Sequence, residues 1–338
     1  MTCVLGYSGG TAGTACLMSG GRILSWAASE RGAPGSATIS ACLDAADAGW
    51  RDVDMVVDCG VEAFPLHPWD PLTGVPHGVP RVTVSRHDAL AHAAAASSAF
   101  GDGVVAVVSC HGTERYEREA GLRYESDSLY ELVDRRLSLR LRHSASAGRS
   151  TLATALDFRR HVCRYVFGAA AEDLAPADGL AALASSGRPG RWSDAAALRC
   201  EAGRVGVESS ALGHLAPERA RSALADPTAN DLAFHADVAH WAQTLIEAAV
   251  LGQLTDWYRE LPRARLIYTG GLAFDGTLNR RVGADTPFGR VHVHGAADAR
   301  SAAIGCCLHG LTRLTDRAVP FVGGGPVGRT AAGPAGSE

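Results

Sequence analysis

Two polar residues at helical spacing could provide ligands for a metal ion. Asp88 and His92 are four residues apart in a segment whose pattern indicates a helix. Because residues four apart lie on one face of a helix, both side chains would point toward one position, where a carboxylate and an imidazole can bind a divalent metal. Each residue alone is more often structural, so the pair predicts a metal site only together with further ligands.

A pair of glycines after a strand-like segment could contact a phosphate group. Residues 265–269 are rich in β-forming side chains and end at Gly270 and Gly271, and a helix is expected over residues 272–282. Glycines let backbone N–H groups approach a ligand closely, and a helix N-terminus favours an anion. The segment therefore predicts a phosphate-binding turn, with a plain tight turn as the alternative.

Asp298 is a further candidate because it lies where a strand is expected to pass into a helix. Residues 289–294 alternate like a strand, and the small residues from Ala299 onward indicate a helix. A carboxylate at this position in an α/β fold is a frequent ligand of a metal or of phosphate-bound water. The alternative is that Asp298 caps the helix that follows it.

The elements expected to position these residues alternate between strands and helices, which indicates an α/β fold. The chain begins with three short strands separated by glycine turns, and the first turn contains Gly9 and Gly10. These glycines would allow backbone contact with a phosphate, with a simple hairpin as the alternative. A helix over residues 38–48 and a strand over residues 53–58 complete the order βββαβ.

The later segments are expected to form a second group of strands and helices. A continuous apolar run at residues 103–109 predicts a buried central strand. Helical spacing predicts helices over residues 127–142, 152–167 and 230–261. We further expect a proline-rich connecting or covering loop at 61–80, an insert at 188–230 with a strand at 203–207 and a polar helix at 217–224, and a disordered tail over 318–338.

Two segments near the end of the chain resemble a known enzyme family. The sequences GGLAFDGTLNR at residues 270–280 and AADARSAAIG at residues 296–305 are similar to two motifs of the nodulation-type and cephem-type O-carbamoyltransferases. The resemblance extends weakly over most of the chain. It implies the actin-like ATPase fold shared with the tRNA threonylcarbamoyltransferase proteins, in which two similar α/β lobes hold a nucleotide and a metal. The lobes would span residues 1–126 and 127–317.

The resemblance also implies which residues form the site. Asp88 and His92 match the HxxxH pair of the family, with His87 as an alternative first ligand. His111 stands where the family has an aspartate at the end of the central strand, which shifts the metal preference from magnesium toward zinc or iron. The implied metal ligands are Asp88, His92, His111 and Asp298, and the implied nucleotide-binding residues are Gly9, Gly10, Gly270, Gly271 and Asn279.

Other family positions differ in this chain. Ala12 and Gly13 stand where the family has a histidine and an aspartate, and Glu30 and Arg31 replace an EER motif. All 32 basic residues are arginine, which excludes a P-loop lysine and a Schiff-base lysine. No catalytic residue is therefore assigned.

Composition limits the compartment and the partners. A net charge of −4 gives no support for a nucleic-acid partner, and no apolar run approaches the length that spans a membrane. The nine cysteines are scattered, without a CxxC pair and without a secretion signal. This pattern predicts reduced, mostly buried thiols in the cytoplasm.

These observations together predict a stand-alone carbamoyltransferase-like protein of secondary metabolism, such as antibiotic biosynthesis. It would bind ATP or carbamoyl adenylate with a divalent metal (iron, zinc, manganese or magnesium) and transfer a carbamoyl-type group to a small-molecule acceptor. Since family proteins usually contain a YrdC-type domain that makes carbamoyl adenylate, we expect a separate YrdC-like or carbamoyltransferase subunit as partner. The alternatives are a catalytically degenerate nucleotide-binding partner or regulator, and an actin-like-fold enzyme with changed metal-dependent chemistry. The oligomeric state is open, a homo-oligomer included.

Overall fold

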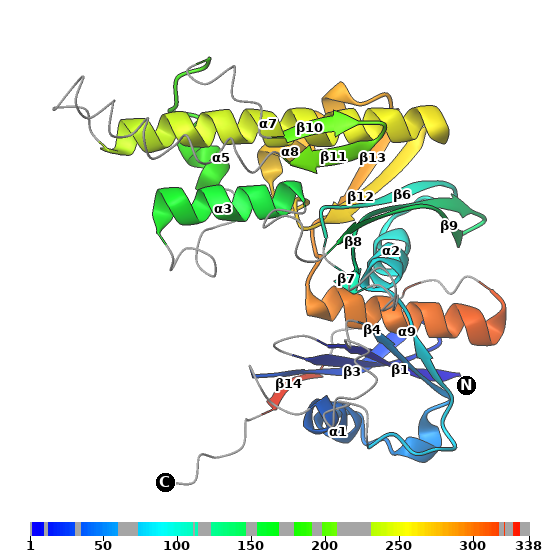
Figure 1. Ribbon diagram of the computed structural model, residues 1–338. Helices are drawn as coiled ribbons and strands as arrows, with labels where there is room; N and C mark the ends of the chain where they lie inside the picture. Colours follow the sequence, from blue (N-terminus) through cyan, green and yellow to red (C-terminus); the bar gives the residue numbers. More distant parts are fainter. Residues whose placement is uncertain are drawn as a thin grey trace, which may run out of the picture.

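Two mixed β-sheets with helices on their faces form the body of the protein (Figure 1). The predictions for Gly10, His111 and the polar helix at 217–224 lie outside the residues that the structure describes. In the part of the chain that is described, no helix is both long and apolar enough to cross a membrane. The computed structural model describes residues 2–9, 13–30, 35–59, 74–110, 112–113, 123–146, 154–168, 179–190, 198–207, 231–317, 321 and 327–331.

The first sheet has the strand order β14-β3-β2-β1-β4-β5. Helix α1 (Gly35–Ala45) connects the third strand to the fourth, so the predicted order βββαβ is confirmed. The first three strands are antiparallel, and the next two continue parallel to β1. The strands are β1 (Cys3–Ser8), β2 (Thr14–Ser19), β3 (Arg22–Ser29), β4 (Met55–Cys59) and β5 (Arg81–Thr83).

The second sheet repeats this topology. Strand β8 lies antiparallel to β6 and β9, whereas β12 is parallel to β6 and β13 is parallel to β12. Apart from the short β7, the order β9-β8-β6-β12-β13 matches β3-β2-β1-β4-β5 strand for strand. The prediction of an actin-like α/β fold with two similar lobes is therefore confirmed. The strands are β6 (Gly103–Val108), β7 (Gly112–Thr113), β8 (Arg123–Val133), β9 (Arg136–Ser146), β12 (Arg265–Gly270) and β13 (Arg290–His294).

Two helices are exchanged between the lobes. Helix α2 (Arg86–Ser97) follows β5 of the first sheet but packs on β6, β8 and β12 of the second. Helix α9 (Ala299–Thr315) follows β13 of the second sheet but packs on β1, β2 and β4 of the first. Figure 1 shows the two helices between the sheets. One apolar cluster includes Val57 of the first sheet and Val105 of the second, so the lobes share a core.

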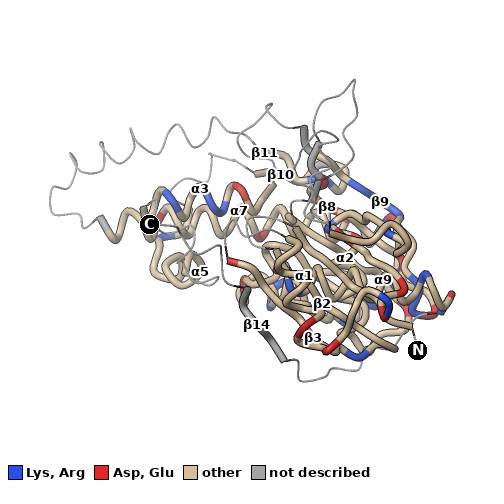
Figure 2. Tube along the Cα trace, turned by 90° about the horizontal axis from the view of Figure 1, so that it is seen from below, with Lys and Arg blue, Asp and Glu red and all other residues tan. Residues whose placement is uncertain are grey.

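The outer face of the second sheet is covered by helices that extend together to one side (Figures 1 and 2). These helices are α3 (Ala155–Phe167), α5 (Gly179–Ala184) and the 30-residue α7 (Asp231–Glu260). Phe158 and Trp241 pack edge to face at 5.7 Å in the same core as Val104 of β6. The predicted helices at 152–167 and 230–261 are thus confirmed. Basic and acidic residues are interspersed along the described elements (Figure 2).

A small hairpin packs on α7. It consists of β10 (Leu198–Glu201) and β11 (Arg204–Val207), which pair antiparallel. The second strand confirms the one predicted at 203–207, whereas β10 was not predicted. All nine cysteines are free thiols, and eight of them are buried, as expected for small apolar side chains.

The prediction of a helix over residues 127–142 is wrong, because this segment is the hairpin of β8 and β9. The prediction used leucines at helical spacing, but the run from Arg136 to Arg142 also alternates between arginine or serine and leucine, which is the period of a strand. Asp134 and Arg135 both have positive φ, 49° and 61°, as a two-residue hairpin turn with right-handed strand twist requires. Neither residue type signals such a turn strongly.

The prediction of a disordered tail over 318–338 is wrong at residues 327–331. This segment forms β14 (Val327–Ala331), which pairs parallel to β3 at the edge of the first sheet. Backbone groups make this pairing, so composition is a poor guide to it. The change of sheet also differs from the predicted boundary at residue 126, because β6 already belongs to the second sheet.

Candidate functional site

The central strand of the second lobe ends beside the starts of the two exchanged helices. Arg86, at the start of α2, donates from Nη2 to the carbonyl oxygen of Ala297 just before α9, at 3.3 Å. The neighbouring His87 has its Nε2 atom 2.5 Å from the carbonyl oxygen of Cys110, which follows β6. We refer to Arg86, His87, Cys110 and Ala297 as the inter-lobe junction. It connects segments that are far apart in the sequence.

The first turn of each lobe follows the carboxyl end of its central strand. Gly9 N, after β1, donates to the carbonyl oxygen of Cys59 at 2.8 Å. In the second lobe Ser109 follows β6 with a φ of 50°, and its N–H donates to Asp127 Oδ1 at 2.8 Å. The Ser109 hydroxyl is buried and has no hydrogen-bond partner among the described residues. Because ligands of α/β sheets bind outside the carboxyl ends of strands, both turns are candidates for phosphate contact.

The glycine pair after β12 is required by packing. A Cβ atom on Gly270, which has a φ of 125°, would lie 2.0 Å from the carbonyl oxygen of Val108 in β6. A Cβ atom on Gly271 would lie 2.2 Å from Leu156 Cδ2. The tight-turn alternative therefore explains both glycines without a ligand. Binding of a phosphate here stays a prediction.

The helix after these glycines starts later than predicted. Helix α8 (Gly276–Asp285) is capped by Asp275, whose Oδ1 atom accepts from Thr277 N at 3.0 Å and from Leu278 N at 2.9 Å. The prediction of a helix from residue 272 is wrong at its N-terminus, since residues 271–274 form a turn and the helix begins at Gly276. A carboxylate already accepts from N–H groups at the N-terminus of α8. It therefore neutralises part of the positive charge at this helix end that could otherwise attract a phosphate.

Asn279, in the first turn of α8, stabilises the preceding turn that contains Ala273. Its Nδ2 atom donates to the carbonyl oxygen of Ala273 at 2.8 Å. Its Oδ1 atom is buried and has no hydrogen-bond partner among the described residues. A buried acceptor without a donor is costly unless a ligand or water supplies one. Asn279 is therefore the predicted nucleotide-binding residue whose geometry most directly indicates a ligand.

Polar residues of α7 that were not predicted surround the same turn. Gln243 Nε2 donates to Asp275 Oδ2 and to Glu247 Oε1, both at 2.9 Å. Arg281 of α8 lies 2.7 Å from Glu247 Oε2. Tyr268 in β12 is fully buried, and this burial raises the pKa of its hydroxyl. Only the i,i+4 spacing of Gln243 and Glu247 in a predicted helix could have indicated this network.

The predicted ligands Asp88 and His92 have protein partners. Asp88 Oδ1 accepts from the Tyr130 hydroxyl at 2.7 Å, and its Oδ2 accepts from Ser85 N at 3.3 Å as part of the cap of α2. His92 Nε2 lies 3.3 Å from Nδ1 of His309 in α9. Burial and the neighbouring His309 lower the pKa of His92 to about 3, so its ring is neutral at physiological pH.

The two other predicted ligands differ in what the structure describes. Asp298 caps α9, since its Oδ1 atom accepts from Ser301 N at 2.8 Å, as the alternative interpretation expected. His111 lies outside the described residues. Within the described ranges, no group of three histidine, cysteine, aspartate or glutamate side chains is arranged to hold a metal. The described residues alone give no support to the implied metal, and the four-ligand site, which includes His111, stays a prediction.

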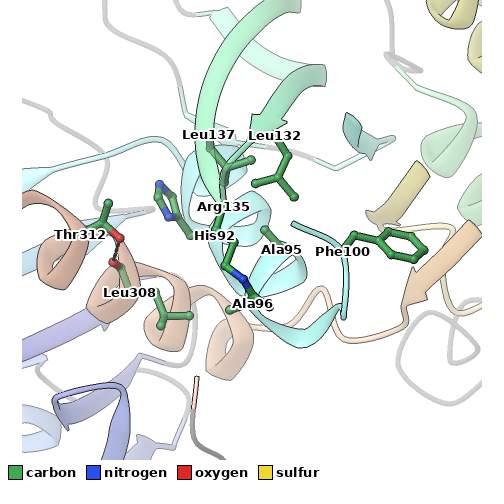
Figure 3. Close-up of a pocket in the computed structure, with 9 residues that line it drawn as sticks. All are labelled: His92, Ala95, Ala96, Phe100, Leu132, Arg135, Leu137, Leu308 and Thr312. Atoms are coloured by element: carbon green, nitrogen blue, oxygen red, sulfur yellow. Dashed lines mark hydrogen bonds between the residues drawn. The ribbon is translucent and has the colours of Figure 1, made fainter. Parts of the chain in front are cut away.

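His92 faces a small cavity between the exchanged helices and the turn of the β8–β9 hairpin (Figure 3). Leu308 and Thr312 of α9 and Arg135 of the turn also line this cavity, which has a volume of about 30 Å³. Such a volume accommodates one or two water molecules and excludes a nucleotide. This cavity is therefore not a candidate nucleotide site, and nucleotide binding at the strand ends described above stays a prediction.

A buried network of charges joins α2 to the β8–β9 hairpin. His87 and Glu125 are both fully buried, with 3.5 Å between Nδ1 and Oε1, and Arg142 Nε lies 2.9 Å from the same oxygen. Burial alone lowers the pKa of His87, but Glu125 and Cys110 raise it to about 9. Arg142 also lies 3.6 Å from Asp88, so the network has two positive and two negative side chains. The sequence did not indicate it, because Glu125 and Arg142 meet only in the hairpin.

Comparison with known proteins gives similarities of structure only. No protein-family model and no curated protein sequence matches the chain. A solved structure of component A of (R)-2-hydroxyglutaryl-CoA dehydratase from Acidaminococcus fermentans is similar with a TM-score of 0.49 at 13% identity, over 91% of this chain and 97% of that one. A ROK family glucokinase from Streptomyces griseus is similar with a TM-score of 0.46 at 17% identity, over 92% of this chain and 99% of the glucokinase. Full-length HypF is similar with a TM-score of 0.47 at 11% identity, over 90% of this chain and 54% of HypF.

These TM-scores are below 0.5, so the assignment of the fold depends on the repeated strand order and the exchanged helices. The resemblance to the O-carbamoyltransferases stays a prediction from the sequence motifs.

Proposed function

We propose that this protein binds ATP or carbamoyl adenylate between its lobes and transfers a carbamoyl-type group to a small metabolite of secondary metabolism. The proposal is supported by the duplicated strand order, which brings the turns after β1, β6 and β12 to the carboxyl ends of parallel strands. Backbone groups of Gly9 and Gly10 would contact phosphate from the first lobe, and Gly270, Gly271 and Asn279 would contact the nucleotide from the second.

The observation that supports nucleotide binding best is the buried Oδ1 atom of Asn279 without a partner among the described residues. A ribose hydroxyl or the amino group of a base is a donor that could satisfy it. The other hydrogen bond of the side chain, to Ala273, holds the amide in a fixed orientation. A preorganised acceptor of this kind favours binding, because no ordering of the side chain is needed when the ligand arrives.

We predict that ATP binds to the wild-type protein and that Asn279→Ala weakens binding about tenfold or more, since a lost buried hydrogen bond is worth on the order of 1–2 kcal/mol. Isothermal titration calorimetry with ATP, with and without Mg²⁺, measures both affinities. Gly283→Ala is the control, because Gly283 lies in the same helix and a Cβ atom there would meet no atom within 4 Å. Absence of ATP binding to the wild type would contradict nucleotide binding, and equal affinities in Asn279→Ala and wild type would contradict this location.

The transfer step requires a separate source of carbamoyl adenylate. We propose a YrdC-type protein as that source, and a small hydroxyl-bearing molecule as the acceptor. In the balanced step, the acceptor oxygen forms a bond to the carbamoyl carbon, the bond from that carbon to the phosphate oxygen breaks, AMP leaves, and the hydroxyl proton passes to solvent. Release of AMP from supplied carbamoyl adenylate, measured by chromatography with and without the protein, tests this activity. AMP release at the uncatalysed rate with every acceptor would argue against it.

A second candidate function is a nucleotide-binding partner that stabilises or regulates an intact carbamoyltransferase. It is favoured by the engaged side chains of Asp88, His92 and Asp298, each of which already has a protein partner. Nucleotide binding without accelerated AMP release would support this candidate. Binding together with AMP release would support the transferase.

Metal analysis of the purified protein tests the predicted ligands Asp88, His92, His111 and Asp298. The predicted site requires that His92→Ala and Asp298→Ser lower the metal content together. Serine also caps helices well, so Asp298→Ser removes the carboxylate and keeps the start of α9. Equal metal content in the wild type and both variants, measured by elemental mass spectrometry, would contradict the predicted four-ligand site.

A further inference from the structure

His87 is a fully buried residue of α2 whose two ring nitrogens are both engaged. Nε2 lies 2.5 Å from the carbonyl oxygen of Cys110, and Nδ1 lies 3.0 Å from Ser128 Oγ. Ser128 in turn donates to Glu125 Oε1. The sequence motifs offered His87 only as an alternative metal ligand, and the proposed function gives this histidine no role. Its contacts nevertheless connect α2 to the segment that follows β6.

The hydrogen bonds determine where the protons on the ring are. A carbonyl oxygen only accepts, so Nε2 must donate to Cys110 and must carry a proton. Since the Ser128 hydroxyl gives its proton to Glu125, Ser128 Oγ accepts from Nδ1, which must carry a proton as well. The ring is therefore an imidazolium, and the fully buried carboxylate of Glu125 balances its charge. A charged donor makes the bond to Cys110 stronger than a neutral one would.

The position of Cys110 gives this bond a consequence beyond stability. Cys110 comes directly after Ser109, whose φ of 50° is in the left-handed region, and both residues lie between β6 and β7. Such a backbone conformation costs on the order of 1 kcal/mol and is kept only where neighbouring contacts hold it. Hydrogen bonds to three residues hold it: Asp127 accepts from Ser109 N, the carbonyl oxygen of Ser126 accepts from Cys110 N at 3.1 Å, and His87 donates to the Cys110 carbonyl.

We propose that His87 is a positioning residue that fixes the turn after β6 to helix α2, so that this turn is preformed for the phosphates of the nucleotide. The proposal rests on the proposed function, because the turn after β6 is one of the strand-end turns that support it as candidates for phosphate contact. His87 itself does not touch the nucleotide.

Two substitutions by neutral side chains distinguish the contact of His87 with Cys110 from its contact with Ser128. In His87→Gln the amide nitrogen reaches the position of Nε2 and can still donate to Cys110, whereas in His87→Asn the amide reaches only the position of Nδ1 beside Ser128. Both variants remove the charge of the imidazolium equally. We expect His87→Asn to weaken ATP binding about tenfold or more and His87→Gln to keep it within about threefold of the wild type.

A second readout does not depend on the nucleotide. Cys110 is buried, so its alkylation by iodoacetamide reports opening of the turn, and Cys163 in α3 provides the reference rate in the same digest. We expect Cys110 to react faster in His87→Asn than in His87→Gln, while Cys163 reacts equally in both. If the wild type failed to bind ATP, the proposed function would be wrong. The alkylation difference would still test whether the hydrogen bond from His87 to the Cys110 carbonyl holds the turn.

The proposal is overturned if both variants lose ATP affinity and expose Cys110 to the same degree, because the effect would then come from the lost charge. It is also overturned if neither variant changes either readout. Urea denaturation of both variants identifies any difference that arises from global unfolding alone.

Discussion

Replacing Gly305 with alanine is expected to destabilise the folded protein by about 3 kcal/mol or more. A Cβ atom at this position would lie 1.8 Å from the carbonyl oxygen and 2.5 Å from the carbonyl carbon of Ala89. Both are backbone atoms, so no side chain can rotate away and the two exchanged helices must separate. Because α2 and α9 each pack on the sheet of the other lobe, their separation disturbs both lobes at once.

The matched control for this substitution is Gly283→Ala in α8. No atom lies within 4 Å of a Cβ atom at Gly283, and alanine in a helix is about 0.5–1 kcal/mol more favourable than glycine. The same substitution should therefore stabilise one helix and disrupt the other. Urea denaturation at equilibrium measures both free energies of unfolding. A Gly305→Ala protein as stable as the wild type would show that the helices do not need this close contact.

Replacing Glu125 with alanine is expected to destabilise the protein by about 3–5 kcal/mol, which is typical when one partner of a buried ion pair is removed. The carboxylate is fully buried beside the imidazolium of His87 and the guanidinium of Arg142. Without it, the fully buried His87 would lose its counter-charge, whereas Arg142, whose side chain is 34% exposed, would keep Asp88 as a partner. Ser128 would also lose the acceptor of its hydroxyl.

Glu131→Ala is the comparison for this prediction, because Glu131 lies in the same strand and pairs with Arg140 and Arg263. The side chains of these arginines are 54% and 48% exposed, so water can solvate their charges after the substitution and the loss of stability should be much smaller. Chemical denaturation of the two variants gives the difference. Equal losses of unfolding free energy in the two variants would mean that burial of the His87–Glu125 pair does not increase its contribution to stability.

Elements with a strong local period were predicted correctly from the sequence. The apolar run of β6, the β-rich run of β12 and the long pattern of α7 each have one secondary structure that buries their side chains. The segment from Asp127 to Arg142 fits two periods, and only the left-handed turn at Asp134 and Arg135 makes it a hairpin. The strand at residues 327–331 had no local signal, since it is formed by pairing with the free edge of β3.

The candidate site shows the same division. Asp298 and the glycines at 270 and 271 were identified from their positions at strand and helix ends, and the structure places them at those ends. Asp88 was identified from its spacing to His92 in a predicted helix, and it lies in the first turn of α2. Their structural partners were not predicted. Asp88 accepts from Tyr130, which is 42 residues away, and Gly270 packs on Val108 of a strand far earlier in the chain. A motif gives the type of residue at a position, whereas the partner depends on which strands are neighbours.

The sequence by itself determined the strands and helices that have a strong local period, the small residues at their ends and the absence of lysine, because these depend on residue type and local spacing. Only the tertiary structure decided that Gly305 must be a glycine, that His87 is an imidazolium and that Asp88 and His92 already have partners. The reason is physical: the free energies of close backbone contact and of buried charge depend on which segments meet, and segments as distant in the sequence as α2 and α9 meet only in the folded chain.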